Sequence, residues 1–203
     1  MDHAARIEGI GCLAGIAPWK RERIAEMLAN RQGPPIAGSA AEAVRLAKAN
    51  GGAVACWASR HPPGLAELAA AEGVEVWSIE DGFVRSAGLG AALVQPGSIV
   101  LDRRGPHYDP RQPSELEVLL AETAFGPDLL ARAEGLIATL REARITKYNL
   151  AGDRPELPQG RRVVLVAGQV EDDLSVQLGG LGQTMADVLA RARAEEPDAF
   201  LVY

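Results

Sequence analysis

The sequence has little cysteine and a deficit of positive charge. Its two cysteines, Cys12 and Cys56, lie in apolar runs without metal-ligand spacing. This pattern is typical of reduced core thiols in a cytosolic protein and excludes a disulfide scaffold. The formal net charge is −6. Because nucleic-acid binders carry a basic field that replaces phosphate counterions, this charge argues against a nucleic-acid partner.

Long apolar runs are also absent. No run reaches the roughly 18 residues that a membrane-spanning helix needs. The segment 10–17 comes nearest to a signal-peptide core, but Asp2 and Glu8 precede it and no small-residue cleavage site follows before Trp19. We therefore expect a buried first strand in this segment. The absence of a spanning segment still allows docking on a membrane surface.

The chain does contain enough apolar residues for a large core. Hydrophobic residues make up 47% of its 203 positions, and a chain of this size buries about 70% of the surface that its unfolded form exposes. Short apolar runs alternate with helical patterns, which predicts an α/β fold with a Rossmann-like parallel sheet and helices on both faces. The expected strands are 7–14, 53–58 and 74–79, and the expected helices are 18–30, 40–50 and 62–72.

The second half of the chain predicts a domain boundary. Segment 98–101 is a fourth strand candidate, Ser114 and Glu117 form a capping box for a short helix, and a longer helix is expected over 127–144. We expect an N-terminal domain over 1–150 and a linker over 151–162, which is rich in Pro and Gly. A truncated second α/β domain is expected over 163–203, with strands at 163–167 and 199–203 around a helix at 182–196.

Two short polar segments stand out in the first domain. Glu80, Asp81, Arg85 and Ser86 directly follow the expected strand 74–79, and strand ends in such sheets collect ligand-binding loops. An ordinary acidic turn with an internal arginine salt bridge is the structural alternative. The second segment contains Lys147 and Asn149 and follows the long helix. A basic residue closing a helix also complements the helix dipole, so this segment alone indicates little.

A third polar segment follows the expected strand 163–167. It includes Gln169, the adjacent carboxylates Glu171, Asp172 and Asp173, and then Ser175. Adjacent carboxylates repel one another unless a cation or a ligand meets them. The pattern therefore leaves three interpretations open. These are a hard-cation site, a nucleophile or acid/base carboxylate for sugar transfer, and an exposed acidic loop.

Taken together, these segments resemble a known family. The order of these segments is that found in bacterial capsule polysaccharide biosynthesis proteins of the retaining β-Kdo transferase type. The resemblance is carried by residues 80–90, 98–102, 113–117, 147–149 and 168–173, together with Gly105 and the pair Tyr108-Asp109. The resemblance covers about residues 11–203. It is closest to the C-terminal module of the two-module capsule enzyme.

The resemblance implies a GT-B glycosyltransferase with two Rossmann-like domains. The donor would be CMP-β-Kdo, held mainly by the second domain, and the acceptor would be a Kdo-bearing lysophosphatidylglycerol, contacted by the first. It implies no cofactor and no metal. It also implies a cytoplasmic protein and leaves open peripheral association with the inner membrane and with capsule assembly proteins.

The family's essential aspartate falls on Asp173, so the resemblance implies that Asp173 is the nucleophile of a double displacement, which retains configuration. Glu171 and Asp172 are supporting candidates, and Gln169 and Ser175 are further substrate-binding candidates in the same loop. Glu80 or Asp81 is expected to act as acid/base. Arg85 and Lys147, with Ser86 and Asn149 beside them, are expected to bind the Kdo carboxylate or the donor phosphate, where charge-assisted hydrogen bonds are strongest.

The sequence departs from the family pattern at two places. Pro106 and His107 stand where the family often has an apolar residue and a tyrosine, and the Lys-Pro-His-Pro segment expected after Tyr203 is absent. A fragment without that segment is expected to be inactive alone. The alternatives are a non-catalytic binding module derived from a transferase half and an unrelated nucleotide-binding α/β enzyme.

Overall fold

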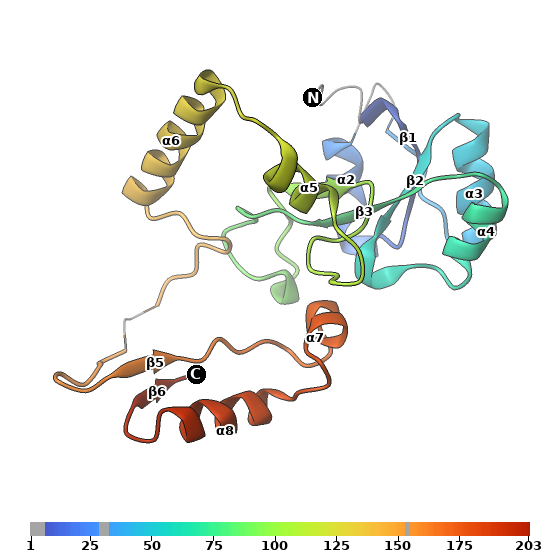
Figure 1. The fold of residues 1–203 in the computed structure, drawn as a ribbon. Coiled ribbons are helices and arrows are strands. Elements are labelled where there is room, and N and C mark those ends of the chain that lie inside the picture. Colours follow the sequence, from blue (N-terminus) through green and yellow to red (C-terminus); the bar gives the residue numbers. More distant parts are fainter. Residues whose placement is uncertain (1–6, 29–32, 153–154) are drawn as a thin grey trace. The chain divides into compact units, whose positions relative to one another are not determined.

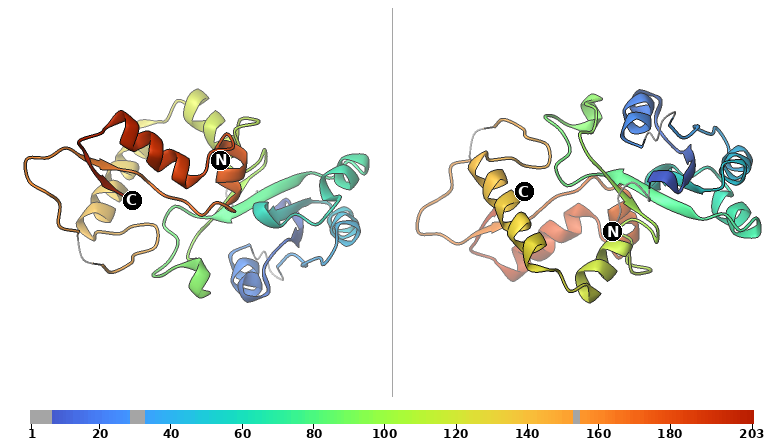
Figure 2. Two further views of the ribbon diagram at one scale, coloured as in Figure 1. Left: turned by 90° about the horizontal axis from the view of Figure 1, so that it is seen from below. Right: turned by 90° about the horizontal axis from the view of Figure 1, so that it is seen from above.

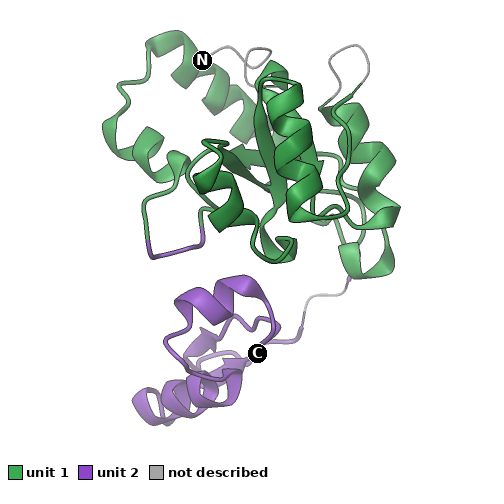
Figure 3. Ribbon diagram, turned by 90° about the vertical axis from the view of Figure 1, so that its right-hand side faces the viewer, with its two compact units in different colours: residues 1–107, 112–150 green, residues 108–111, 151–203 purple. Residues whose placement is uncertain are grey.

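The computed structural model describes residues 7–28, 33–152 and 155–203. The chain divides into two compact units (Figure 3). The first comprises residues 1–107 and 112–150, and the second comprises residues 108–111 and 151–203. Each unit has its own β-sheet.

The sheet of the first unit has four strands in the order β1-β2-β3-β4 (Figure 1). They are β1 (Ile10–Ala14), β2 (Ala53–Trp57), β3 (Val76–Asp81) and β4 (Ile99–Asp102). The first three strands pair in parallel, as expected, whereas β4 runs antiparallel to β3. The reason is the connection: a parallel crossover usually needs a helix, and the chain between β3 and β4 forms only the short 3-10 turn η3 (Gly90–Ala92).

Helices cover both faces of this sheet, which confirms the sequence prediction (Figure 2). On one face, η1 (Pro18–Lys20) and α2 (Arg21–Met27) pack against the larger apolar side chains of the strands. On the other face, α3 (Ala40–Ala49) and α4 (Leu65–Ala71) pack against smaller residues. Among the fully buried strand residues, Leu13 and Ile79 belong to the first face, and Val54 belongs to the second.

The outer edge of β1 carries one additional pairing. The N–H of Leu13 donates to the Pro35 carbonyl at 2.7 Å, and the N–H of Ala37 donates to the Leu13 carbonyl at 2.8 Å. Ile36 therefore forms an isolated parallel bridge with Leu13. All five residues of β1 are buried.

Two helices follow β4 in the first unit. The first, α5 (Glu115–Glu122), begins with the predicted capping box: the Ser114 hydroxyl accepts from the N–H of Glu117, and the Glu117 carboxylate accepts from the N–H of Ser114. The second, α6 (Pro127–Glu142), has no buried residue. Within the described ranges, no helix has both the length and the apolar character needed to cross a bilayer.

The second unit has a two-stranded parallel sheet of β5 (Val163–Leu165) and β6 (Phe200–Val202). Between them lie α7 (Leu174–Gly179) and α8 (Met185–Glu195). The sequence predicted β5, α8 and β6 but not α7. With six residues, α7 is too short to show the apolar repeat by which a helix is recognised in a sequence. The side chains of β5 are largely exposed, with Leu165 at 72%.

The thiols of Cys12 and Cys56 are free and completely buried, which confirms their prediction as core residues. Burial raises the pKa of the Cys12 thiol to about 11 and that of the Cys56 thiol to about 12. Because the thiolate is the reactive form, both side chains stay protonated and unreactive at neutral pH.

We predict that neither thiol reacts with Ellman's reagent at pH 8 in the native protein. In guanidinium chloride, both thiols should react at once. A reading of released thiolate against time under the two conditions measures the difference. Rapid reaction of either cysteine in native protein would contradict the buried placement.

Candidate functional site

The first candidate site lies at the carboxyl edge of the parallel strands in the first unit. Lys20 comes from the segment after β1, Trp57 ends β2, and Asp81 ends β3. In open α/β sheets, ligands bind outside this edge, because the loops that leave the strands gather there. The three loops are therefore the place where chemistry-bearing side chains of different segments meet.

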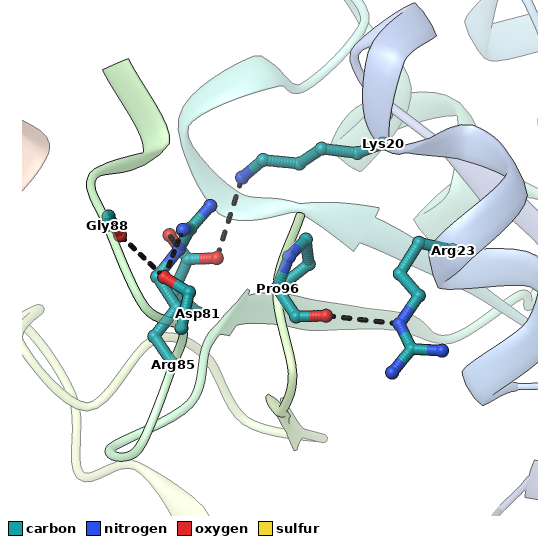
Figure 4. A network of polar contacts seen from close by, with 7 residues as sticks. Lys20, Arg23, Asp81, Arg85, Gly88 and Pro96 are labelled. Carbon is teal, nitrogen blue, oxygen red and sulfur yellow. Dashed lines mark hydrogen bonds and ion pairs between the residues drawn. The ribbon is translucent and has the colours of Figure 1, made fainter. Parts of the chain in front are cut away.

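Asp81 is shared by two cations (Figure 4). The Nζ atom of Lys20 lies 3.5 Å from Oδ1 of Asp81, and Nε of Arg85 lies 2.8 Å from Oδ2. Arg85 is only 1% exposed and Lys20 only 8%. Both oxygens of this carboxylate are thus engaged inside the protein, and the Arg85 guanidinium is not accessible to a ligand in this structure.

Lys20 also lies against aromatic rings. Its Nζ atom is 3.5 Å from the ring centroid of Trp57 and 5.1 Å from that of Trp19. Burial lowers the pKa of Lys20 below its usual range, and the neighbouring Asp81 opposes this effect. A cation over a ring face is stabilised by the ring quadrupole, which offsets part of the cost of burying the ammonium.

The sequence analysis did not single out Lys20 or Trp57. The available signal was positional, because Lys20 lies four residues before the buried Ile24 and therefore on the same side of the helical segment.

The placement of Glu80 and Asp81 corrects the sequence prediction. Strand β3 continues to Asp81, so both carboxylates are its last residues and do not lie in a loop after it. The strand continues because both residues pair with β4, Glu80 with Val100 and Asp81 with Ile99. Successive residues of a strand point to opposite faces of the sheet, so the side chains of Glu80 and Asp81 lie on different faces.

The structure brings the remaining first-unit candidates together through the backbone. The carbonyl of Lys147 accepts from the N–H groups of Arg85 at 2.8 Å and Ser86 at 3.2 Å. The side-chain amide of Asn149 donates to the Ser86 carbonyl at 2.9 Å. The Ser86 hydroxyl accepts from the Arg85 guanidinium and donates to the Gly88 carbonyl, both at 2.7 Å. These bonds fix the loop after β3, and the ammonium of Lys147 is exposed beside it.

The second candidate site is the loop between β5 and α7 in the second unit. Asp173 is the N-cap residue of α7. Its Oδ1 atom accepts from the backbone N–H of Ser175 at 2.9 Å and from the Ser175 hydroxyl at 2.5 Å. Because both hydrogen bonds go to Oδ1, the carboxylate is held in one orientation, and no hydrogen bond to Oδ2 is found within the described residues.

The other polar residues of this loop point to different partners. Glu171 accepts from the N–H of Met185 at the start of α8, at 3.2 Å. The N–H of Gln169 contacts the Met185 sulfur at 3.4 Å, and the Asp172 carboxylate is exposed. Across the described parts of the chain, no three His, Cys, Asp or Glu side chains converge in a metal-binding arrangement. The loop carboxylates thus diverge.

Known proteins share this sequence pattern. The family model of the capsule polysaccharide biosynthesis proteins matches residues 52–152 and 126–203. The lipopolysaccharide-processing protein LpsZ of Rhizobium meliloti is 37% identical over 152 residues, which are 69% of this chain and 34% of LpsZ. The capsule polysaccharide modification protein LipA of Neisseria meningitidis is 37% identical over 127 residues, which are 62% of this chain and 18% of LipA.

Two solved structures share the fold. The beta Kdo 2,4 transferase of Thermosulfurimonas dismutans KpsC superposes with a TM-score of 0.71 at 25% identity over 94% of this chain. The beta Kdo 2,7 transferase of the same KpsC gives 0.70 at 27% identity over 96%. This chain spans 59% of each of those structures and about a third or less of the relatives named above. The matched residues cover most of the chain, which therefore belongs to the family of capsule polysaccharide biosynthesis proteins.

Proposed function

We propose that this chain carries the acceptor-side domain and the beginning of the donor-side domain of a retaining β-Kdo transferase. The donor is CMP-β-Kdo and the acceptor is a Kdo-bearing lysophosphatidylglycerol. Family membership and the likeness to two Kdo transferase structures over nearly the whole chain support this proposal. The observation that carries the chemistry is the oriented Asp173 carboxylate at the end of the loop after β5.

Asp173 is proposed as the nucleophile. The Ser175 hydrogen bonds hold Oδ1, so Oδ2 is the oxygen available to attack the anomeric carbon of the donor. A bond forms between Oδ2 and that carbon while its bond to the phosphate oxygen breaks, and CMP leaves with the electron pair. The acceptor hydroxyl then loses its proton to a base and attacks the same carbon, which releases the carboxylate. Two inversions retain the β configuration.

Glu80 is the candidate that we carry forward for the base. The sequence left Glu80 and Asp81 as equal candidates, and the ion pairs of Asp81 with Lys20 and Arg85 give Asp81 a positioning role. We assign Asp81 and Arg85 to positioning the loop after β3. Lys147 and Asn149, whose backbone and side chain hold that loop, are proposed at the rim of the acceptor site.

Replacing Asp173 by Asn in the complete gene product that contains this sequence should lower Kdo transfer by several orders of magnitude, because the amide keeps the shape but is a poor nucleophile. Asp172→Asn is the matched control and should cost less than about tenfold, since its carboxylate is exposed. Transfer is measured as product formed from CMP-Kdo. Near-normal transfer by Asp173→Asn would show that the nucleophile is another group.

The proposal also predicts that transfer needs no divalent metal. Positive side chains and helix N-termini take the role of stabilising the departing phosphate. Transfer by the complete gene product should therefore be unchanged by EDTA. Loss of activity in EDTA that Mg²⁺ restores would refute this prediction and would return the acidic loop to the hard-cation interpretation.

The positioning role of Asp81 predicts a stability effect. Asp81→Asn leaves two buried cations without their shared counter-charge, so the free energy of unfolding should fall by about 3 kcal/mol. Urea denaturation followed by tryptophan fluorescence measures it. Glu72→Gln, which breaks the exposed Lys48–Glu72 pair, is the control and should have a far smaller effect. Equal decreases in the free energy of unfolding in the two variants would mean that the ion pairs of Asp81 stabilise the protein no more than an exposed surface pair does.

A further inference from the structure

A groove at the carboxyl ends of β1 and β2 has no role in the chemistry described so far. It encloses about 740 Å³ and belongs entirely to the first unit. One wall is the start of α3, another is the segment after β1, and the third is the segment after β2. The lining residues are Gly15, Ile16, Pro18, Arg21, residues 37–40 and residues 59–63.

The charges of the groove are of one sign. Arg21 and Arg60 supply the positive charge, His61 also lines the groove but burial lowers its pKa, and no carboxylate is among the lining residues. Neither arginine forms an ion pair with a carboxylate in the described ranges, and the only bond found for Arg21 runs from Nε to the Ile16 carbonyl at 3.3 Å. The groove therefore carries local positive charge in a chain whose net charge is −6.

The start of α3 adds to this positive field. The helix begins after Ser39, whose hydroxyl accepts from the N–H of Glu42. Ala40, the first helical residue, lines the groove, and the first N–H groups of a helix have no acceptor within the helix. These N–H groups and the aligned peptide dipoles favour an anion at this end. The Glu42 carboxylate, which does not line the groove, accepts from the N–H of Gly38 at 2.8 Å and offsets part of this positive field.

The backbone around the groove is held in place. Gly15 has a φ of +67°, and a Cβ atom there would lie 2.5 Å from the Arg60 carbonyl oxygen. The segments after β1 and β2 therefore touch at a point that admits only glycine. Pro62 follows His61 directly and restricts that residue to extended backbone, with φ −59° and ψ 127°. The backbone of Arg60 and His61 is thus fixed at this edge of the groove.

A second groove on the same unit offers a comparison. It lies at the amino ends of β2 and β3 and is lined by Lys48, but also by Glu72 and Glu75. The Lys48 ammonium forms an ion pair with Glu72, so its positive charge is already balanced by a carboxylate of the same protein. The arginines that line the groove at the carboxyl ends, in contrast, have no carboxylate partner among the described residues.

We propose that the groove lined by Arg21, Arg60 and His61 binds an oxyanion of the acceptor, either the carboxylate of its Kdo residue or its phosphate. The identity of the ligand as the acceptor rests on the proposed function, whereas the affinity for an oxyanion rests on the groove itself. Arginine forks pair with carboxylate and phosphate through two parallel hydrogen bonds, which fixes the orientation of the bound group. The groove therefore aligns the acceptor.

The test is a titration of the 203-residue chain, labelled with ¹⁵N, followed by amide chemical shifts. The probes are free Kdo, glycerol 3-phosphate and neutral glycerol. Saturable shifts of the Gly38, Ala40 and His61 amides are expected with an anionic probe and not with glycerol. Response to Kdo alone assigns the groove to the carboxylate, and response to glycerol phosphate alone assigns it to the phosphate.

Variants locate the binding. Arg60→Gln and, separately, Arg21→Gln should each weaken binding of the responding anion by about fivefold or more. Arg45→Gln, at an exposed position on α3 outside the groove, should leave the affinity within about twofold. The amide spectrum of each variant reports its folding. Absence of saturable shifts, or equal weakening by Arg45→Gln, would overturn the proposal.

Failure here is separable from failure of the proposed function. Anion binding by the 203-residue chain is measured without any transfer reaction. Loss of transfer in Asp173→Asn together with no anion binding would refute only the groove. Normal transfer in Asp173→Asn together with arginine-dependent binding would refute only the nucleophile.

Discussion

The geometry of the first unit depends on one carboxylate that two cations share. Asp81 ends the third parallel strand, Lys20 comes from the segment after the first, and the ring of Trp57 closes the second. Asp81 therefore ties the segment after β1 to the loop after β3, and Lys20 connects both to the end of β2 through the Trp57 ring. Removing two cations from water is costly, and the cost is tolerable only because each cation meets both a carboxylate and further polar or aromatic groups. The hydrogen bonds from Arg85 and Ser86 to Lys147 extend the same constraint to a segment far along the chain.

Sequence reasoning succeeded where the determinants are local. The second strand, α3 and the capping box of α5 follow from apolar runs and from side chains within four residues, and the structure has them at or near the predicted bounds. It failed at the end of β3, because two carboxylates ordinarily stop a strand. The Asp81 carboxylate is stabilised by Arg85 and by Lys20, which lies about sixty positions earlier in the chain, and both acidic residues pair with β4. No local pattern contains that information. The direction of β4 was missed for a related reason, since it depends on the connection and not on the strand's own residues.

The candidate site divides in the same way. The acidic loop of the second unit was located from three adjacent carboxylates, but their separate partners were not, because α7 and α8 supply the N–H groups that they accept from. The groove with Arg21 and Arg60 was missed altogether. Its residues are dispersed over three segments, and only the parallel pairing of β1 with β2 places these segments at one edge. The spacing of charged residues along the sequence therefore does not predict such a groove.

The short pairing on the outer edge of β1 has a consequence for the behaviour of the protein in concentrated solution. A strand whose five residues are all buried is an apolar template, and its free N–H and C=O groups invite pairing with another chain. The segment around Ile36 occupies the donor and the acceptor of Leu13, the fourth of the five residues of that strand. Intermolecular strand pairing needs several hydrogen-bonding groups along one edge, and in a strand of five residues the pairing at Leu13 leaves too few of them free. The one bridge thus serves as protection against edge-to-edge aggregation.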